Sequence, residues 1–344
     1  MNRQRIKKIQ AQLRQPVLIK KPENLAYLIG RTFMHGYLLL KKNNLVFFGD
    51  GLEKAPGIQR TDLLKNVGRY IRSHETLELF GEFTYNETAY IKHKNPKLRL
   101  QVTARRSPAD QERQVKDIQE LAKVRKSMEI TAAVFALVKK QLKRKVWTER
   151  KLAEFIQKTG FRLGAEDVSF PAIAAAGANA ATPHHVPSQK IIKTGEALIL
   201  DFGFKYKSYC SDFTRTLFLK RAPKTLETAY SQVEKAYLES IQAARPGVQA
   251  GKIYDHAVRV LAEKKLDKYF IHSLGHGTGL EIHELPNLSP GSKDILRPGM
   301  VFSIEPGVYV PKVGGIRIED LVYLTSAGAR KFINVATKLE EQIL

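Results

Sequence analysis

Cysteine is nearly absent from the chain, which has 344 residues and a single cysteine, Cys210. One cysteine excludes an internal disulfide and is typical of a protein from a reducing compartment, so we expect a cytoplasmic location. Cys210 lies two residues before Asp212, where a reactive thiol is conceivable. A lone cysteine is more often a small buried side chain, and we interpret it as structural.

Long apolar runs are missing as well. No stretch approaches the roughly 20 apolar residues that a membrane-spanning helix needs. No charged start is followed by the apolar core of a signal peptide. The sequence therefore predicts a soluble protein without a membrane partner.

Acidic residues are few beside the basic ones, because 34 Asp and Glu stand against 57 Lys and Arg and give a net charge of +23. Such an excess attracts polyanions. The basic residues are nevertheless spread along the chain, and no nucleic-acid-binding signature accompanies them. We do not expect specific recognition of nucleic acid, although the charge keeps a binding module in consideration.

Two domains fit this length. Residues 1–107 contain short apolar strands and short helices, which predict a small α/β domain with no evident chemistry of its own. A charged segment with Ser107-Pro108 follows, and it is typical of a linker. The second domain is expected to span 108–344 and to begin with a long helix, in which apolar residues recur at helical spacing from Val115 onward.

The second domain has an internal repeat of element types. Two helical patterns precede a series of strands up to Leu219, and after Pro223 two more helical patterns precede more strands. Such a duplication can build a pseudo-twofold sheet with helices on its outer face and a groove between the halves. We therefore expect an α+β fold.

Two carboxylates frame the most informative segment of this domain. The apolar run 197–200 predicts a buried strand that ends in Asp201, and a second strand carrying Asp212 returns after a turn at Gly203. A buried, ionised carboxylate costs several kcal/mol unless it is paired or bound to a cation. The segment alone leaves two interpretations open, a metal site or a salt bridge to Arg215 with a second acid on a surface turn.

Three more candidate ligands lie further along the chain. His276 stands between glycines, Glu305 follows the apolar strand 300–304, and Glu319 follows Ile316-Arg-Ile318. Together with Asp201 and Asp212 they form a set of four carboxylates and one imidazole. That set carries too much negative charge for a dry core, and two divalent cations about 3.5–4 Å apart would neutralise it.

These segments resemble the pita-bread metallopeptidases, the family of methionine aminopeptidase, aminopeptidase P and prolidase. The acids Asp201 and Asp212 have the family spacing, and Ser-Asp-Phe-Thr-Arg-Thr surrounds the second one. The resemblance implies that Asp201 chelates one metal, that His276 and Glu305 hold the other, and that Asp212 and Glu319 bridge both. It further implies a duplicated pita-bread catalytic domain behind a smaller N-terminal domain.

Other segments are similar to the aminopeptidase P and prolidase branch, namely Asn24–Gly30, Thr182–Pro187 and Gly315–Asp320. This similarity implies an enzyme that hydrolyses the Xaa-Pro bond at the N-terminus of peptides, as an aminopeptidase or a dipeptidase. Its substrate would be a peptide with proline in second position. A homodimer is expected by analogy alone. The competing hypothesis is a metal-free pita-bread module that binds protein or nucleic acid.

The same resemblance implies roles for further residues. His184 and His283 would flank the substrate, with His283 donating to the developing oxyanion. Glu305 would shuttle the proton, and His272 would lie in the outer shell of the substrate site. Arg317 either holds a substrate carboxylate or pairs with a nearby acid.

The ligand set also limits the metal. Oxygen ligands with one imidazole favour Mn²⁺, Co²⁺, Zn²⁺ or Fe²⁺ over a thiolate-selected metal, and we expect two ions of Mn²⁺ first. One departure from the family stands in the first domain, where Asp50-Gly-Leu-Glu53 replaces the frequent Asp-x-Arg-Tyr. It bears on the contacts of the first domain and on oligomer geometry rather than on the metal ligands.

Overall fold

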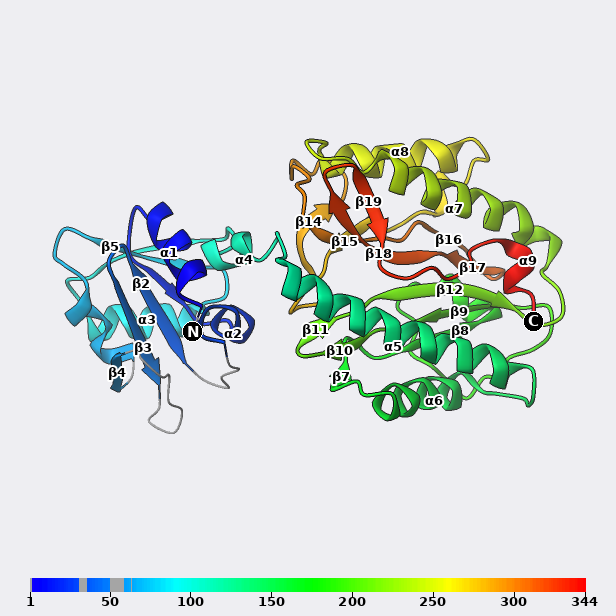
Figure 1. Ribbon diagram of the computed structural model, residues 1–344, viewed down its shortest axis with the longest axis horizontal. Helices are drawn as coiled ribbons and strands as arrows, with labels where there is room; N and C mark the ends of the chain where they lie inside the picture. The colour runs from blue at the N-terminus through cyan, green and yellow to red at the C-terminus, as the bar shows by residue number, and fades with distance from the viewer. Residues whose placement is uncertain (1, 31–35, 50–58, 63) are drawn as a thin grey trace. The chain divides into compact units, whose positions relative to one another are not determined.

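The computed structural model describes residues 2–30, 36–49, 59–62 and 64–344 (Figure 1). The chain divides into two compact units, Met1–Arg113 and Gln114–Leu344. The sequence placed the boundary after residue 107, whereas the short helix α4 (Pro108–Glu112) belongs to the first unit. The reason is local, because the Asn24 amide donates to Ser107 Oγ at 3.2 Å and to Asp110 Oδ1 at 3.1 Å. The departure at Asp50–Glu53 lies outside the described residues.

The first unit is a six-stranded sheet in the order β4-β3-β2-β1-β5-β6. Its elements are α1 (Arg3–Gln12), β1 (Val17–Ile19), α2 (Pro22–Ile29), β2 (Tyr37–Lys41), β3 (Asn44–Gly49), β4 (Gln59–Asp62), η1 (Leu64–Tyr70), β5 (Thr76–Phe80), α3 (Tyr85–Lys94) and β6 (Arg99–Thr103). Buried apolar residues of four of these strands, among them Leu18, Leu39, Val46 and Leu77, form its core. The α/β character expected for this part of the chain is confirmed in these residues.

The second unit contains the expected repeat of two helices followed by strands. Its first half holds α5 (Ile118–Leu142), α6 (Glu149–Arg162), β7 (Asp167–Val168), β8 (Ile173–Ala176), η2 (Gly177–Ala181), β9 (Ala197–Asp201), β10 (Phe204–Tyr206), β11 (Tyr209–Cys210) and β12 (Phe213–Phe218). Its second half holds α7 (Lys224–Ala243), α8 (Ala250–Ala262), η3 (Asp267–Tyr269), β13 (Gly275–Gly277), β14 (Glu284–Leu288), β15 (Val301–Ile304), β16 (Gly307–Val310), β17 (Gly314–Arg317), β18 (Glu319–Thr325), β19 (Gly328–Lys331) and α9 (Leu339–Gln342).

One eight-stranded antiparallel sheet connects the halves in the order β14-β13-β15-β18-β12-β9-β8, with β19 paired to β18. Each half has its own apolar core. Residues of α5 and α6 pack with strands of the first half, and residues of α7 and α8 pack with strands of the second. Figure 1 shows the two helix pairs on opposite sides of the strands in that view.

The long helix α5 begins at Ile118, three residues after the apolar pattern does. Asp117 caps it, since its side chain accepts from the Glu120 amide at 2.9 Å while the Glu120 carboxylate accepts from the Asp117 amide. Val115 instead pairs in an isolated bridge with Met300. Thr148 caps α6 in a similar way, because its side chain accepts from the Lys151 amide.

The strand register places the acids beside one another. Asp201 is the last residue of β9 and lies opposite Thr214 of β12. Thr214 also lies opposite Glu319, the first residue of β18. Carboxylates from segments far apart in sequence are therefore brought to the ends of neighbouring strands.

The connection from β9 to β12 is longer than the single turn that the sequence suggested. Strands β10 and β11 form a hairpin of their own and join β7 in a small sheet. Its turn residues Lys207 and Ser208 have φ angles of 46° and 66°. Gly203 is required here because a Cβ would lie 1.9 Å from the Ser211 carbonyl oxygen.

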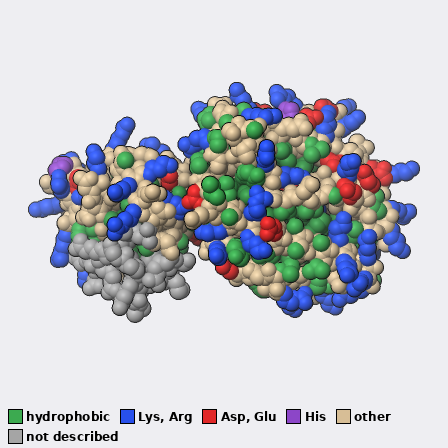
Figure 2. Space-filling model, viewed as in Figure 1, with side chains coloured by type: hydrophobic (Ala, Val, Ile, Leu, Met, Phe, Trp, Pro, Cys, Tyr) green, Lys and Arg blue, Asp and Glu red, His purple; other side chains and the backbone are tan. Residues whose placement is uncertain are grey.

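The distribution of basic side chains on the surface (Figure 2) and the burial of Cys210 agree with the sequence analysis. Within the described residues, none of the helices is long and apolar enough to cross a membrane. Figure 2 shows Lys and Arg side chains distributed over the visible surface of the second unit rather than gathered in one tract. Cys210 is buried, and burial raises the pKa of its thiol to about 12, which fits a structural residue rather than a reactive thiol.

Candidate metal centre

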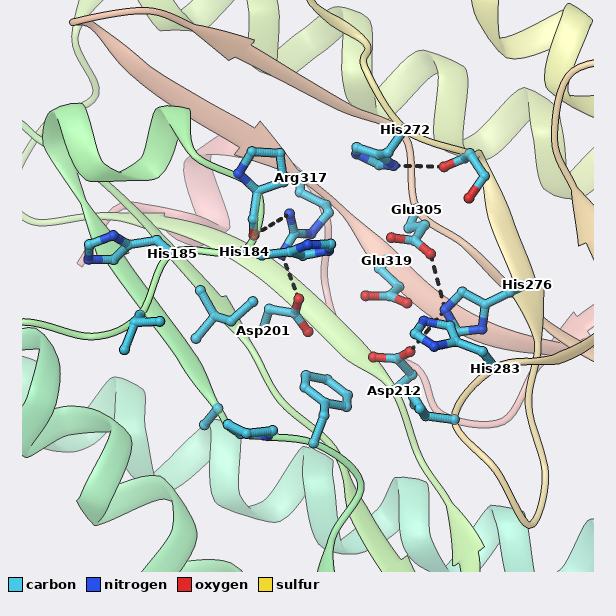
Figure 3. A pocket seen from close by; sticks show the side chains of 18 of the residues that line it. His184, His185, Asp201, Asp212, His272, His276, His283, Glu305, Arg317 and Glu319 are labelled. Atoms are coloured by element: carbon cyan, nitrogen blue, oxygen red, sulfur yellow. Dashed lines mark hydrogen bonds and ion pairs between the residues drawn. The ribbon is translucent and has the colours of Figure 1, made fainter. Parts of the chain in front are cut away.

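A cavity of about 570 Å³ opens in the second unit (Figure 3). Every residue given a catalytic, substrate-binding or metal-binding role in the sequence analysis lines it, namely His184, Asp201, Asp212, His272, His276, His283, Glu305, Arg317 and Glu319. Apolar side chains such as Phe170, Ile173 and Ile282 supply part of the wall. A cavity of this size, apolar with a few convergent polar groups, suits a small ligand.

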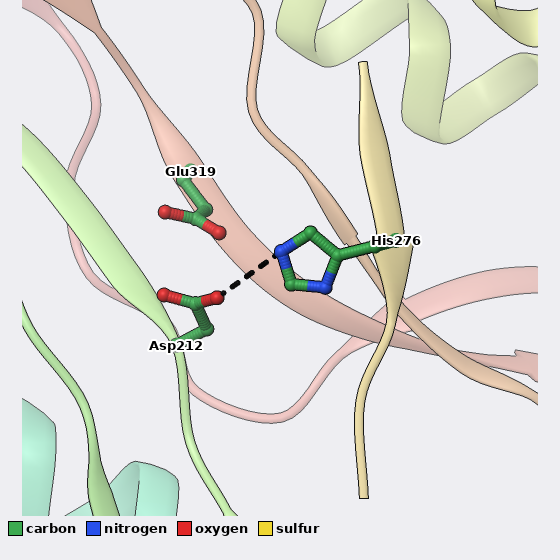
Figure 4. Close-up of side chains that lie close together, drawn as sticks. All are labelled: Asp212, His276 and Glu319. Atoms are coloured by element: carbon green, nitrogen blue, oxygen red, sulfur yellow. Dashed lines mark ion pairs between the residues drawn. The ribbon is translucent and has the colours of Figure 1, made fainter. Parts of the chain in front are cut away.

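The carboxylates point toward one another from different strands (Figure 3). Asp212 precedes β12, Glu305 follows β15, and Glu319 opens β18. One ligand atom each of Asp212, His276 and Glu319 lie within 4.8 Å of one another (Figure 4). This spacing suits donors that share a cation.

The orientation of His276 turns the lone pair of its Nε2, and not an N–H group, toward the carboxylates. Its Nδ1 lies 3.1 Å from the Gly277 carbonyl oxygen, which can only accept, so we assign the proton to Nδ1. The lone pair of Nε2 then faces Glu305 Oε1 at 3.3 Å and Asp212 Oδ2 at 3.5 Å. Burial lowers the pKa of His276 to about 3, so the ring is neutral at pH 7. Three electron-pair donors thus converge on one point, as a cation requires.

Two further carboxylate oxygens lack a partner. Asp201 Oδ1 and Glu319 Oε1 are buried and accept no hydrogen bond from the described part of the chain. Their second oxygens are bound, because Arg317 donates to Asp201 Oδ2 at 2.5 Å and Thr214 Oγ1 donates to Glu319 Oε2 at 2.6 Å. A buried acceptor without a donor costs about 1–3 kcal/mol, so these oxygens also fit hard divalent cations.

The acids of the site resist ionisation together. Burial, followed by the charges of Asp201 and Glu305, raises the pKa of Asp212 well above its ordinary value. Burial and the charge of Asp212 do the same for Glu319. Burial raises the pKa of Glu305 to about 8, although Arg317 opposes this. The raised pKa values mean that the four acids, if all were ionised, would carry more negative charge than the protein alone neutralises.

We expect the metal-depleted protein to lose about 1–2 kcal/mol of stability between pH 6.5 and 8.5. The Glu305 carboxyl keeps a proton up to about pH 8 in the folded chain, whereas an unfolded chain releases it near 4.5. Raising the pH through this window removes that proton at the expense of the folded state. Below pH 6.5 the lowered pKa values of His272 and His276 make stability rise with pH instead, and pH 6.5 is therefore the lower limit of the window.

Urea unfolding after chelation, at pH 6.5 and at pH 8.5, measures this slope. Glu305→Gln serves as the control and is expected to reduce the slope. Saturating Mn²⁺ is expected to reverse it, because the cation competes with protons for the same oxygens. Stability that rises with pH in the chelated protein would contradict the shared-charge description of the cluster.

Arg317 pairs with an acid, which is one of the two roles left open for it. Its guanidinium contacts Asp201 and also donates to Tyr309 Oη at 2.6 Å. Tyr309 in turn lies 2.9 Å from His272 Nε2, and His272 Nδ1 lies 2.7 Å from the Ser273 carbonyl. Tyr309 escaped the sequence analysis, because a tyrosine in the strand Gly307–Val310 has the pattern of any buried strand residue.

The alternative interpretation of the acid pair is wrong. Arg215 contacts neither Asp201 nor Asp212 but donates to Asp320 Oδ2 at 2.8 Å, with both side chains fully buried. It also donates to the carbonyl oxygens of Thr214 and Glu319. Arg215 thus binds the strands that carry the acids from the buried side, whereas Asp201 and Asp212 face the cavity.

Comparison with known proteins identifies the family of the chain. The model of metallopeptidase family M24 matches residues 122–326, which is more than half of the chain. The chain belongs to metallopeptidase family M24. The Xaa-Pro dipeptidase of Pyrococcus furiosus is 32% identical to it over 337 residues, which cover 95% of this chain and 94% of that protein.

Solved M24 structures are similar over almost the whole chain. The Xaa-Pro dipeptidase from Bacillus anthracis superposes with a TM-score of 0.91 at 27% identity and covers 99% of each chain. The X-Pro aminopeptidase from Thermotoga maritima gives a TM-score of 0.83 at 25% identity, covering 98% of this chain and 100% of that one. The expected pita-bread fold behind an N-terminal domain is confirmed, and this M24 protein is a metal-dependent hydrolase rather than a metal-free binding module.

Proposed function

We propose that this M24 peptidase hydrolyses Xaa-Pro bonds with two divalent metal ions, and that Xaa-Pro dipeptides are its preferred substrates. The observation that carries the proposal is the convergence of the His276 lone pair with four carboxylates in one cavity. The preference for dipeptides is supported by the name of the Pyrococcus furiosus relative, which aligns over 94% of its length.

For the metal we propose the ligands implied by the sequence. Asp201 and its free Oδ1 would serve one ion, His276 and Glu305 the other, and Asp212 and Glu319 would lie between them. Mn²⁺ is the first choice, since oxygen donors outnumber the single imidazole. When bound, two such ions acidify a water and polarise a carbonyl.

The remaining residues act on the substrate and on protons. We assign to Glu305 the transfer of the proton between the attacking water and the leaving proline nitrogen, because its carboxylate lines the cavity with Oε1 3.3 Å from His276 Nε2. His184 and His283 flank the substrate, and the His283 ring packs edge to face on His276 with centroids 4.3 Å apart. That packing supports the proposed role of His283 as a nitrogen donor to the carbonyl oxygen on which charge develops. Arg317 and His272 both contact Tyr309, and we assign to them the orientation of the substrate in this part of the cavity.

Chelation is expected to abolish hydrolysis of Ala-Pro, and added Mn²⁺ is expected to restore it. Release of proline is measured after dialysis against chelator and after return of Mn²⁺, Co²⁺ or Zn²⁺ in turn. Ala-Pro is expected to be cleaved faster than Ala-Pro-Ala-Ala, with Ala-Ala as the control that lacks proline. Turnover that ignores the chelator would contradict the proposal, and equal cleavage of Ala-Ala would contradict its specificity.

Two further proposals concern the state of the protein in the cell. A homodimer is expected by analogy with related folds, and sedimentation analysis at several concentrations tests it. A cytoplasmic location is supported by the single, buried cysteine.

A further inference from the structure

A buried carboxylate lies behind one wall of the cavity. Glu149 is the first residue of α6, and its exposed fraction is 0%. Its oxygens accept hydrogen bonds from Ser188 Oγ at 2.6 Å, the Ala176 amide at 2.8 Å, His185 Nε2 at 2.9 Å, the Ser188 amide at 3.0 Å and Asn179 Nδ2 at 3.0 Å. No Lys or Arg nitrogen is among these donors in the described part of the chain.

The carboxylate is ionised nonetheless. Burial opposes ionisation, yet hydrogen bonds from Ser188, the Ala176 amide and His185 outweigh it and lower the pKa of Glu149 to about 2. A carboxylate that satisfies so many donors fixes their relative positions, because each donor would be left unpaired without it. Glu149 thereby joins the start of α6, the end of β8 and the segment that contains Ser188.

That segment, residues 182–190, forms the cavity wall that carries His184. It has no helix or strand of its own. Pro183, His184, Val186 and Pro187 line the cavity. Two backbone amides at the start of α6 also hold this segment. The Glu149 amide donates to the Lys190 carbonyl at 3.1 Å, and the Arg150 amide donates to the Ser188 carbonyl at 2.9 Å.

The two adjacent histidines of this segment have different surroundings. Figure 3 shows His184 beside Arg317 and Asp201, whereas His185 lies apart from the carboxylates. His185 reaches the rim of the cavity, and its ring is bound to Glu149. The His184 ring makes no hydrogen bond within the described chain, so its place depends on its backbone. Arg317 binds this backbone at the Pro183 carbonyl at 3.4 Å, and Glu149 holds it on the other side through His185 and Ser188.

We propose that Glu149 is a positioning residue that holds His184 at the substrate, acting through His185 and Ser188. The inference rests on the proposed peptidase function. Glu149 touches neither the cavity nor the metal ligands, so it acts on the geometry of the reaction and not on metal binding. Misplacement of a reacting group by about 1 Å can reduce a rate about 100-fold.

Glu149→Gln is the main test, because it keeps the shape and replaces one acceptor oxygen by a donor that faces other donors. We expect kcat for Ala-Pro to fall about 10–100-fold, KM to change less than about threefold, and Mn²⁺ affinity by calorimetry to stay the same. Hydrogen exchange of residues 182–190 in the metal-depleted protein is expected to become faster. Glu154→Gln, an exposed glutamate on the same helix, is the matched control and is expected to behave like wild type.

Two milder variants keep the test decisive if Glu149→Gln does not fold. Ser188→Ala should give a smaller fall in kcat, and His185→Gln, whose amide can still donate to Glu149, should retain more activity than His185→Leu. Wild-type kcat together with unchanged exchange in Glu149→Gln would overturn the inference. So would a loss of Mn²⁺ affinity equal to the loss of kcat, since that marks a general structural defect. Failure of the proposed function is seen separately, as a wild-type protein that does not cleave Ala-Pro.

Discussion

Asp212→Asn is expected to reduce kcat/KM for Ala-Pro by about 1000-fold or more, while making the metal-depleted protein more resistant to heat. Asp212 Oδ2 lies 3.5 Å from His276 Nε2, and after burial the charges of Asp201 and Glu305 contribute most to its raised pKa, with Arg317 opposing them. Removing its charge takes away a donor to the cations, and such cations contribute several kcal/mol to transition-state stabilisation. In the absence of metal the same change relieves repulsion among buried carboxylates.

The opposite signs of the two effects make this a sharp test. Activity is measured at saturating Mn²⁺, and thermal unfolding is followed with chelator and with Mn²⁺. Wild type should gain stability from Mn²⁺ according to its affinity, whereas Asp212→Asn should gain far less. Asp255→Asn on the exposed face of α8 is the matched control. A variant that keeps its turnover, or that is less stable than wild type under chelation, would contradict the role given to Asp212.

Asp320→Ala is expected to destabilise the fold by about 3–5 kcal/mol, which is the cost of leaving a buried partner charge alone. The Arg215 guanidinium would lose its only carboxylate partner among the described residues, and Tyr237 would lose the acceptor of its hydroxyl. Urea unfolding of the metal-depleted protein measures the change. Because Arg215 also donates to the Glu319 carbonyl at 2.6 Å, Mn²⁺ affinity should weaken as well.

Replacing both Arg215 and Asp320 distinguishes the loss of their ion pair from the cost of leaving one buried charge alone. Arg215→Met with Asp320→Leu should be less destabilised than the sum of the single variants, since neither charge is then left unpaired. The exposed pair Lys235–Glu263 at 2.6 Å is the control, and Glu263→Gln should not shift the unfolding midpoint. Additive single effects at Arg215 and Asp320 would show that the two side chains act independently.

The clustering of acids at the candidate metal centre was largely predictable, because a charge next to an apolar strand is costly and therefore informative. Asp201, Glu305 and Glu319 each border an apolar strand, and all three line the cavity. The sequence predicted Glu319, and not the adjacent Asp320, as a candidate ligand. Successive residues of a strand face opposite sides, so one acid lies in the cavity and the other in the core against Arg215.

The supporting residues were not predictable, because their partners are set by long-range register. Tyr309 binds Arg317 and His272, and Glu149 binds residues from two later segments. Each looks like an ordinary strand or helix residue in the sequence. The start of α5 shifted for a related reason, since Val115 matches the helical spacing but pairs with Met300 instead.

The division of the proposed metal ligands between the two halves has a consequence for synthesis. Asp201 and Asp212 leave the ribosome well before His276, Glu305 and Glu319, and they meet the later residues only when β18 pairs with β12. A nascent or truncated chain that ends before β13 has two acids and none of the later donors. With the proposed ligands, tight capture of metal would be restricted to finished molecules, and unfinished ones would be left without the ion that stabilises the fold.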